Sequence, residues 1–316
     1  MTNAVAQAAT TEHMEQFKGK ITKGVGGNYE VHVEGHGTVL CRAKGILRYR
    51  RMQPLIGDNV SVEIDAAGAG NITEILPRAN ELVRPAIANV DQALLVCAIR
   101  EPEFHPNLLD RFLILMSRQN MPVLVCFNKT DLAEDGEAER LCRIYRDCGA
   151  DVYVTQASDP RTLEALREAL TGKTTVLAGP SGVGKSTIMN AMQPEAAMEV
   201  GELSEKIKRG KQTTRHTQLF CVAPDTYLCD TPGFSSLYLA DILPEELGTY
   251  FPEFTEYAGQ CRYPDCRHLQ EPDCAVRAAV ERDEIPKERY DSYRLLFDEL
   301  SGRRIIYSRK PKHEEG

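Results

Sequence analysis

The stretch TTVLA at 174–178, followed by Gly179-Pro180-Ser181-Gly182-Val183-Gly184-Lys185-Ser186, decides the fold of this chain. Its β-branched and apolar start predicts a buried strand, and the run STIMNAM that opens at Ser186 predicts a helix. Between them, the pattern G-x-x-x-x-G-K-S predicts a loop whose backbone N–H groups surround phosphate oxygens, with the helix dipole adding to the attraction. This order of elements indicates an α/β domain that binds a nucleotide.

Individual residues of this loop have expected contacts. Lys185 is expected to reach the β- and γ-phosphates, and Ser186 to ligate Mg²⁺. The residues expected to hold the nucleotide are Gly179, Pro180, Ser181, Gly182, Val183, Gly184, Lys185, Ser186 and Thr187. The loop does not identify the base, and GPSGVGKS also looks like the phosphate loop of guanylate kinases. A nucleotide kinase acting on GMP is therefore one alternative.

A second motif, Asn128-Lys129-Thr130-Asp131, follows the apolar run MPVLVCF. It therefore stands at the carboxyl end of a predicted strand, where ligands bind in open α/β sheets. Asp131 can accept hydrogen bonds from the N1–H and the exocyclic amine of guanine, whereas adenine would leave the carboxylate partly unpaired. Asn128 is expected to meet the O6/N7 edge of the base, and the methylenes of Lys129 to cover its face.

The order of the motifs is unusual. Ordinary GTPases place the phosphate loop first, Asp-x-x-Gly second and Asn-Lys-x-Asp third. Here the guanine motif precedes the phosphate loop, and Asp230-Thr231-Pro232-Gly233 follows both. The parts are complete but rotated, and loops at the strand ends can still converge on one pocket. The chain is therefore expected to bind GTP/GDP and Mg²⁺ on a circularly permuted sheet.

The third motif and the loop before it carry the expected switch residues. Asp230 would hold Mg²⁺ through water, and the N–H of Gly233 would sense the γ-phosphate. In the loop RGKQTTRHTQ, Thr213, or Thr214 as the close alternative, would complete the Mg²⁺ shell when GTP is bound.

The residue after Gly233 is Phe234, at a position where many GTPases have a water-orienting Gln. Phenylalanine cannot orient water, so slow intrinsic hydrolysis is expected, with acceleration by a partner or another residue. His216 is a nearby candidate, although an ordinary surface histidine is the simpler interpretation.

The segment 16–80 has a different pattern. Five short runs of alternating polarity, separated by glycines, predict a small closed β-barrel, plausibly of the oligonucleotide-binding type. The chain carries a net charge of −8, yet this segment has nine Lys or Arg and six Asp or Glu, a local net charge of +3. Arg48, Arg50 and Arg51 are candidate phosphate contacts, with Tyr49 available for stacking. A second basic run lies at 206–215.

Strands alternate with helical stretches between about 90 and 230, which predicts parallel βαβ units. The helical stretches are at 107–119, 136–148 and 162–170, and LFCVAPDTYLCD at 219–230 suggests a hairpin. The strand signal stops after about 240. A helix is expected at 287–301, with Tyr290, Tyr293, Leu296, Phe297 and Leu300 on one face.

Four metal-binding side chains cluster in this C-terminal part. Cys261, Cys266, His268 and Cys274 supply three thiolates and one imidazole within fourteen residues, which matches a closed tetrahedral zinc site. Four protein ligands leave no open position, so one structural Zn²⁺ is expected rather than a catalytic one. The cysteines in apolar runs, for example Cys97 and Cys126, are expected to be buried free thiols of a reducing cytoplasm.

These segments together resemble the RsgA/YjeQ-type family of circularly permuted GTPases. The resemblance rests on the barrel, NVDQALLV at 89–96, FNKTD, GPSGVGKST, RGKQTTRH, DTPGFSSL at 230–237 and CRYPDCRHLQEPDCAV, in this order. It departs at 155–158, which reads Thr-Gln-Ala-Ser rather than a clear Ser-Ala-Lys, so the base-edge contact stays open between Gln156 and Ala157. A hydrophobic residue such as Phe234 is typical of the family.

The resemblance implies an α/β fold: a circularly permuted GTPase domain at 83–240, an N-terminal OB-fold barrel at 16–82, and a helical zinc domain at 241–316, after a disordered tail at 1–15. It implies binding to the small ribosomal subunit and its rRNA, subunit-stimulated GTP hydrolysis and a role in late maturation. An RNA-binding assembly chaperone that barely turns over GTP is a further alternative. No apolar run is long enough to span a membrane and no signal peptide is evident, so a cytoplasmic protein, expected to be monomeric, is predicted.

Overall fold

The structure is a computed structural model, and it describes residues 15–44, 53–82, 85–193, 217–230, 239 and 241–302. Several predicted features lie outside the described residues. These are the tail at 1–14, the basic positions 48–51, the basic run 206–215, Thr213 with Thr214, His216, Gly233 and Phe234. The chain forms two compact units, each built from three segments. The first contains Met1–Gln92, Arg167–Ala178 and Met189–Phe234, and the second contains Ala93–Leu166, Gly179–Ile188 and Ser235–Gly316.

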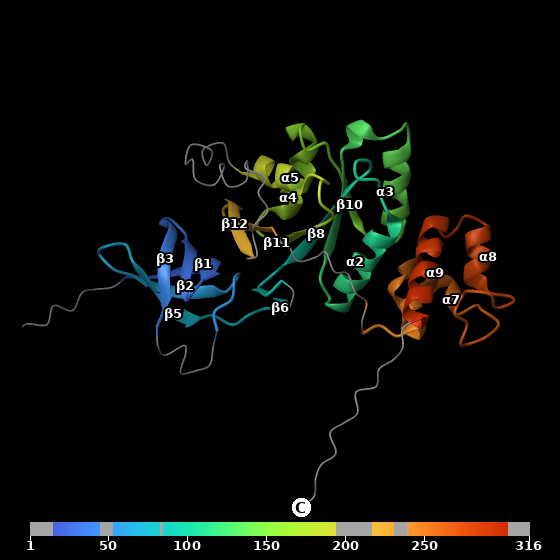
Figure 1. The fold of residues 1–316 in the computed structure, drawn as a ribbon, viewed down its shortest axis with the longest axis horizontal. Coiled ribbons are helices and arrows are strands. Elements are labelled where there is room, and N and C mark those ends of the chain that lie inside the picture. The colour runs from blue at the N-terminus through green and yellow to red at the C-terminus, as the bar shows by residue number, and fades with distance from the viewer. Residues whose placement is uncertain are drawn as a thin grey trace, which may run out of the picture. The chain divides into compact units, whose positions relative to one another are not determined.

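The first unit begins with the predicted barrel (Figure 1). Its strands are β1 (Glu15–Val25), β2 (Asn28–Val33), β3 (Gly37–Ala43), β4 (Asn59–Ile64) and β5 (Gly70–Ile75). They close in the order β1-β2-β3-β5-β4, with β3 and β5 parallel and the other pairs antiparallel. Alternate residues such as Val31, Val33 and Val60 fill the interior, because successive side chains of a strand point to opposite faces. The predicted five-stranded barrel is confirmed.

A short antiparallel pair, β6 (Glu81–Leu82) and β7 (Ile87–Ala88), follows the barrel. The first unit also contains β11 (Thr174–Ala178), β12 (Gln218–Ala223) and β13 (Thr226–Asp230). β11 pairs with β13 in parallel, and β12 pairs with β13 antiparallel, which confirms the hairpin expected near 219–230.

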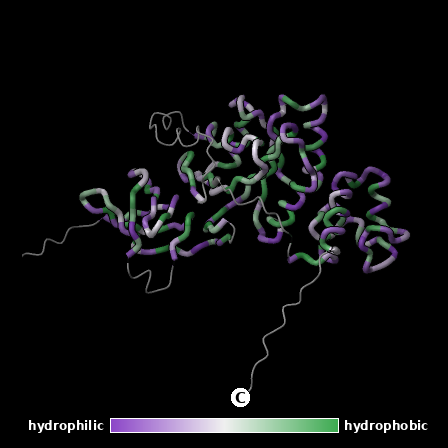
Figure 2. Tube along the Cα trace, in the orientation of Figure 1, coloured by the Kyte–Doolittle hydropathy of each residue, from purple (hydrophilic) through white to green (hydrophobic). Residues whose placement is uncertain are grey.

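The second unit contains the strands β9 (Val123–Asn128) and β10 (Asp151–Val154), and β8 (Gln92–Ala98) from its second residue onward. These three strands are parallel neighbours. The six-stranded sheet has the order β10-β9-β8-β11-β13-β12. The strands β8 and β11 are buried along their whole length, as expected for parallel strands covered on both faces. Figure 2 shows hydrophobic colours along much of this central region.

Helices connect these strands. They are α2 (Pro106–Arg118), α3 (Glu137–Asp147), α4 (Glu164–Leu170) and α5 (Lys185–Met192), with 3-10 turns η1 (Thr130–Leu132) and η2 (Pro160–Leu163). The predicted helical stretches at 107–119 and 136–148 correspond to α2 and α3. The stretch 162–170 is divided between η2 and α4, because Asp159 accepts a hydrogen bond from the Arg161 N–H and starts a separate turn at Pro160.

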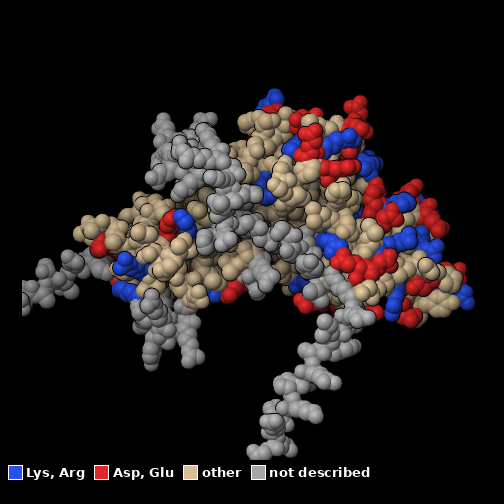
Figure 3. Space-filling view, viewed as in Figure 1, with Lys and Arg blue, Asp and Glu red and all other residues tan. Residues whose placement is uncertain are grey.

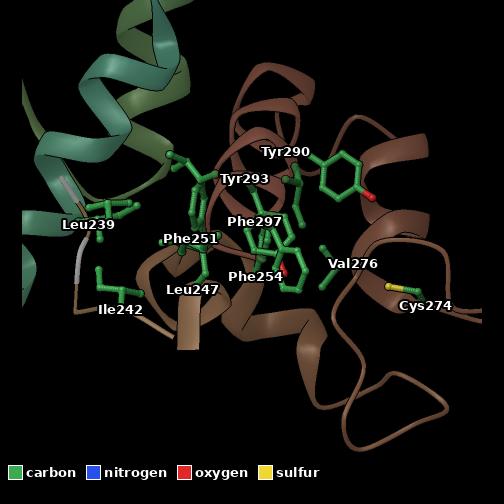
Figure 4. Close-up of a cluster of buried hydrophobic side chains, with 14 of the residues drawn as sticks. Leu239, Ile242, Leu247, Phe251, Phe254, Cys274, Val276, Tyr290, Tyr293 and Phe297 are labelled. Atoms are coloured by element: carbon green, nitrogen blue, oxygen red, sulfur yellow. The ribbon is translucent and has the colours of Figure 1, made fainter. Parts of the chain in front are cut away.

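The C-terminal residues form a helical module with its own core. Its elements are η4 (Pro244–Tyr250), η5 (Pro252–Phe254), α7 (Thr255–Ala258), α8 (Ala275–Glu281) and α9 (Lys287–Ser301). The predicted helix at 287–301 is α9, and its apolar face packs against Leu247, Phe251 and Phe254 (Figure 4). Phe251 and Phe254 stack, and the ring of Tyr293 meets both at its edge.

A buried ion cluster attaches this module to α2. The Arg289 side chain of α9 is 2% exposed, and it pairs with Asp110 of α2 and with Glu253 of η5, the latter at 2.7 Å. Its guanidinium also lies over the Phe251 ring at 4.7 Å. Burial raises the pKa of Asp110, and the positive charge of Arg289 opposes that shift. Arg111 with Glu299 adds a second α2–α9 ion pair.

Replacement of Arg289 by Met should strongly destabilise the protein. The substitution keeps much of the aliphatic stem but leaves two buried carboxyl groups without their cation, which costs about 3–5 kcal/mol. Arg294→Met, on the exposed face of the same helix, is the matched control and should change the unfolding free energy by less than about 0.5 kcal/mol. Denaturant unfolding followed by circular dichroism measures both, and equal effects would mean that the buried cluster is not a source of stability.

Candidate functional site

The phosphate loop has the backbone that its glycines predict. Gly179, Gly182 and Gly184 have φ values of 136°, 82° and 101°, which side-chain-bearing residues rarely adopt. A Cβ on Gly179 would lie 2.1 Å from the Val96 carbonyl oxygen of β8. The loop leads directly into α5, whose first hydrogen bond runs from the Ile188 N–H to the Gly184 carbonyl at 2.9 Å.

Three side chains of this loop are predicted nucleotide contacts. The Lys185 ammonium donates to the carbonyls of Gly179 and Pro180 at 2.8 and 2.7 Å, so it folds back over the loop. Ser186 and Thr187 are exposed on the first turn of α5. This arrangement leaves the hydroxyls open to a ligand at the helix N-terminus, where anions are favoured.

Asn128 connects the guanine motif to two other loops. Its side-chain amide donates to the Val183 carbonyl of the phosphate loop at 2.8 Å, across 55 positions of sequence. Its oxygen accepts from the Thr155 hydroxyl and from the Ala157 N–H, both at 3.0 Å. The side chain is 1% exposed. A Cβ on Gly184 would lie 2.2 Å from this amide nitrogen, so the glycine is needed for the close approach.

The remaining residues of the guanine motif point outward from β9. Lys129 adopts a left-handed conformation with φ of 61°, and its ammonium donates to the Glu101 carbonyl. Asp131 lies in η1 and is exposed. The predicted contact of Asn128 with the O6/N7 edge would have to use its second amide hydrogen, because its oxygen is already bonded within the protein. Contacts of these residues with a base stay predictions.

The loop after β10 contains a residue whose role the motif search missed. Thr155 is buried, and its hydroxyl both donates to Asn128 and lies 3.2 Å from the Cys126 sulfur. The sequence left the contact with the base edge undecided between Gln156 and Ala157. In the structure the Ala157 N–H donates to Asn128, while the Gln156 side chain donates to Ser158. A threonine after a strand that neighbours β9 is the signal that could have identified this support.

Three residues of the candidate site stand at carboxyl ends of parallel strands. Asn128 ends β9, Thr155 follows β10 and Gly179 follows β11. This is the edge at which open α/β sheets bind ligands.

Removing the Thr155 hydroxyl should weaken guanine nucleotide binding. Thr155→Val keeps the shape but leaves the Asn128 oxygen with one partner fewer, which costs about 1 kcal/mol, or five- to tenfold in GDP affinity. Thr155→Ser keeps the hydroxyl and should stay within about twofold of the parent. Calorimetric titration with GDP measures both. Unchanged affinity of the Val variant would show that the Asn128 geometry does not need this support.

The predicted metal ligands also come together. The ligand atoms of Cys261, Cys266, His268 and Cys274 all lie within 4.8 Å of one another. The Cys261 and Cys274 sulfurs are 3.9 Å apart, and they lie 3.6 and 3.4 Å from the His268 Nδ1. Tetrahedral zinc bonds would separate two sulfurs by about 3.8 Å and a sulfur from a nitrogen by about 3.6 Å. The donor set and its spacing therefore fit Zn²⁺.

The surrounding residues fix this cluster to α9 and α8. The hydroxyls of Tyr290 and Tyr293 donate to the carbonyls of His268 and Arg267 at 2.7 and 2.6 Å. The Cys274 sulfur accepts from the Arg277 N–H at 3.5 Å at the start of α8. Glu271 accepts from the N–H groups of Arg267, Leu269 and Gln270, which bends the loop between the second and fourth ligands. Such outer contacts orient metal ligands.

Removal of zinc should loosen the C-terminal module more than the nucleotide site. We expect one equivalent of zinc per chain, and Cys266→Ser should lose the metal because hydroxyls replace thiolates poorly as zinc ligands. Metal analysis measures the content, and limited proteolysis should then cut within 241–302. GDP affinity of the same sample should change less than about threefold, about 0.65 kcal/mol. Absence of stoichiometric zinc in the parent protein would remove the assignment.

Charge is distributed unevenly over the surface. Figure 3 shows Lys and Arg interspersed with Asp and Glu over the C-terminal helices, where ion pairs such as Arg282 with Glu284 and Lys287 with Asp291 form.

In the part of the chain that the structure describes, no helix has both the length and the apolar character needed to cross a membrane.

Comparison with known proteins matches this architecture along the chain. The RsgA GTPase family model matches residues 75–240, and the model for the RsgA N-terminal domain matches residues 18–72. The small ribosomal subunit biogenesis GTPases RsgA of Agathobacter rectalis and Alkaliphilus metalliredigens are each 43% identical to this chain. The alignments cover 90% and 91% of this chain and 98% and 99% of those proteins.

Solved structures agree with the sequence comparison. YloQ, described as a circularly permuted GTPase, superposes with a TM-score of 0.72 at 37% identity, over 95% of this chain and 100% of that chain. YjeQ from Thermotoga maritima gives a TM-score of 0.72 at 35% identity, over 92% and 100%. Matched motifs, sheet order and relatives lead to one conclusion: the chain belongs to the RsgA family of circularly permuted GTPases.

Proposed function

We propose that this protein hydrolyses GTP to GDP and phosphate on the small ribosomal subunit, in support of late subunit maturation, and that the subunit stimulates the reaction. The names of the relatives support the small ribosomal subunit as the partner, because these relatives are called small ribosomal subunit biogenesis GTPases. The same motifs argue against a guanylate kinase, in which the guanine motif and the Asp-x-x-Gly turn would have no role.

The observation that carries the proposal is the bonding of Asn128. The guanine motif and the phosphate loop are joined by its 2.8 Å bond to Val183, although the motif order is rotated. One side chain therefore holds together the loop that would select the base and the loop that would bind phosphate. This supports a single guanine nucleotide pocket.

The residues proposed to act on the nucleotide follow from the same geometry. Lys185 would release the loop carbonyls to bind the β- and γ-phosphates, and Asp131 would pair with guanine. Mg²⁺ would be held by Ser186, by Asp230 through water and by Thr213, and it would neutralise charge on the phosphates. Gly233 would bind the γ-phosphate through its N–H. With Phe234 in place of a water-orienting Gln, the isolated protein would turn over slowly.

The other domains would serve the ribosomal partner. We assign 16–82 to RNA binding, 83–240 to the nucleotide and 241–316 to a zinc-stabilised module, with a single structural Zn²⁺ on Cys261, Cys266, His268 and Cys274. The positions 48–51 and the basic run 206–215 are the proposed rRNA contacts. A ribosomal partner supports a cytoplasmic location, and we propose that the protein is monomeric.

The deciding experiment is the GTP hydrolysis rate with and without purified small subunits. We expect a slow intrinsic rate and a stimulation of at least tenfold by small subunits, with no comparable effect of large subunits. ATP with GMP as substrates should give no phosphoryl transfer. A fast intrinsic rate would contradict the role given to Phe234, and an unstimulated rate would leave a GTP-binding assembly chaperone as the better description.

A further inference from the structure

The barrel touches the β12–β13 hairpin through a compact group of side chains. The Tyr227 hydroxyl of β13 lies 2.8 Å from the His32 Nδ1 of β2. The Lys20 ammonium of β1 lies 5.4 Å from the centre of the same tyrosine ring. Lys20 and His32 are neighbours across the β1–β2 ladder, and β1 also contacts β12. Tyr227 is 5% exposed, so the barrel covers it almost completely.

Lys20 faces carboxylates from three different parts of the first unit. Burial lowers the pKa of Lys20, and the negative charges of Asp91, Asp225 and Asp58 oppose that shift. Asp58 belongs to the barrel, Asp225 to the turn of the hairpin, and Asp91 precedes β8 and accepts from the Thr174 N–H of β11 at 2.7 Å. Asp58 is already paired with Arg78 at 2.6 Å, so Lys20 is the barrel cation whose charge is left to act on the carboxylates of the hairpin turn and of the start of the sheet.

A second attachment restricts rotation of the barrel about this contact. The Ala88 N–H of β7 donates to the Ile56 carbonyl at 2.8 Å, and the Asn89 amide donates to the Gly57 carbonyl at 3.0 Å. A Cβ on Gly57 would lie 2.1 Å from the Ala88 carbonyl oxygen, so the backbones are in close contact. The barrel is therefore joined to the β6–β7 segment as well as to the hairpin.

The covered tyrosine is close in sequence to a residue of the nucleotide site. Tyr227 and Asp230 are three residues apart on β13, about 10 Å along an extended strand. Asp230 begins the Asp-x-x-Gly motif and is the proposed water-mediated Mg²⁺ ligand. A shift at Tyr227 would therefore be passed along one short strand to the backbone of Asp230.

We propose that Lys20 and Tyr227 are positioning residues for GTP hydrolysis, through which a ligand bound to the barrel sets the position of Asp230. The inference rests on the proposed function, since the barrel's ligand would be the RNA of the small subunit. Neither residue touches the nucleotide. Both act through β13, so they should govern the stimulated rate and leave the intrinsic site intact.

The test compares two charge reversals on β1 with two conservative substitutions. Lys20→Glu places a fourth carboxylate among Asp58, Asp91 and Asp225 and should separate the barrel from the hairpin. Lys18→Glu makes the same charge change two positions away on β1, at an exposed residue, and therefore controls for a general loss of RNA attraction. Lys20→Arg keeps the cation, and Tyr227→Phe removes only the hydroxyl that meets His32.

The measured quantity is the ratio of kcat at saturating small subunits to kcat without them, with GDP affinity and subunit affinity determined separately. We expect Lys20→Glu to lower this ratio at least tenfold and Tyr227→Phe about threefold, while Lys18→Glu and Lys20→Arg stay within twofold of the parent. GDP affinity and the unstimulated rate should be unchanged in all four.

Three outcomes would overturn the inference: equal stimulation of Lys20→Glu and parent, equal losses in Lys18→Glu and Lys20→Glu, or a loss in Lys20→Glu that Lys20→Arg does not restore. If Lys20→Glu does not fold, as shown by lost GDP binding, Tyr227→Phe decides: a lowered ratio supports the coupling and an unchanged ratio rejects it. Failure of the parent protein to respond to subunits would instead reject the proposed function.

Discussion

A single buried amide holds the nucleotide half of this protein together. Asn128 bonds the phosphate loop with its nitrogen and the 155–157 loop with its oxygen, and the protein leaves it almost no solvent exposure. A buried amide left without partners is costly, so each loop is held where the other two require it. Circular permutation changes the order in which these loops are reached along the chain, but the same strand ends still bring them to one place. The rotated motif order is therefore compatible with an ordinary nucleotide pocket.

The C-terminal module depends on a different kind of constraint. Adjacent residues of α9 face two partners: Arg289 reaches the carboxylates of Asp110 and Glu253, and Tyr290 reaches the carbonyl of His268, a predicted zinc ligand. A module of this size has a small core, and metal ligation with buried ion pairs adds to it. Phe251, Phe254 and Tyr293 belong to the same buried cluster as Tyr290 (Figure 4).

Local patterns in the sequence predicted most of the architecture. Alternation over 16–80 gave the barrel strands, and the phosphate loop, guanine motif and cysteine spacing located the sites because each motif is contiguous. Contacts between segments that are distant in the sequence could not be predicted from these local patterns. Arg289 and Asp110 are separated by 179 positions, and nothing in either neighbourhood identifies the other as its partner. Thr155 and Tyr227 look like ordinary strand-end and strand residues, and only the sheet order and barrel closure reveal what they touch.

The distribution of the ten cysteines has a practical consequence. Six thiols outside the zinc cluster are buried, and burial raises the pKa of Cys126 and of Cys148 to about 12, so very little thiolate exists there at neutral pH. Cys221 is the half-buried exception outside the cluster. An alkylating reagent added to the folded protein with the predicted ion bound would thus find few thiols to label, whereas loss of that ion would free the three cysteine ligands. Thiol counting on the native protein would serve as a direct gauge of how many molecules in a preparation hold their metal.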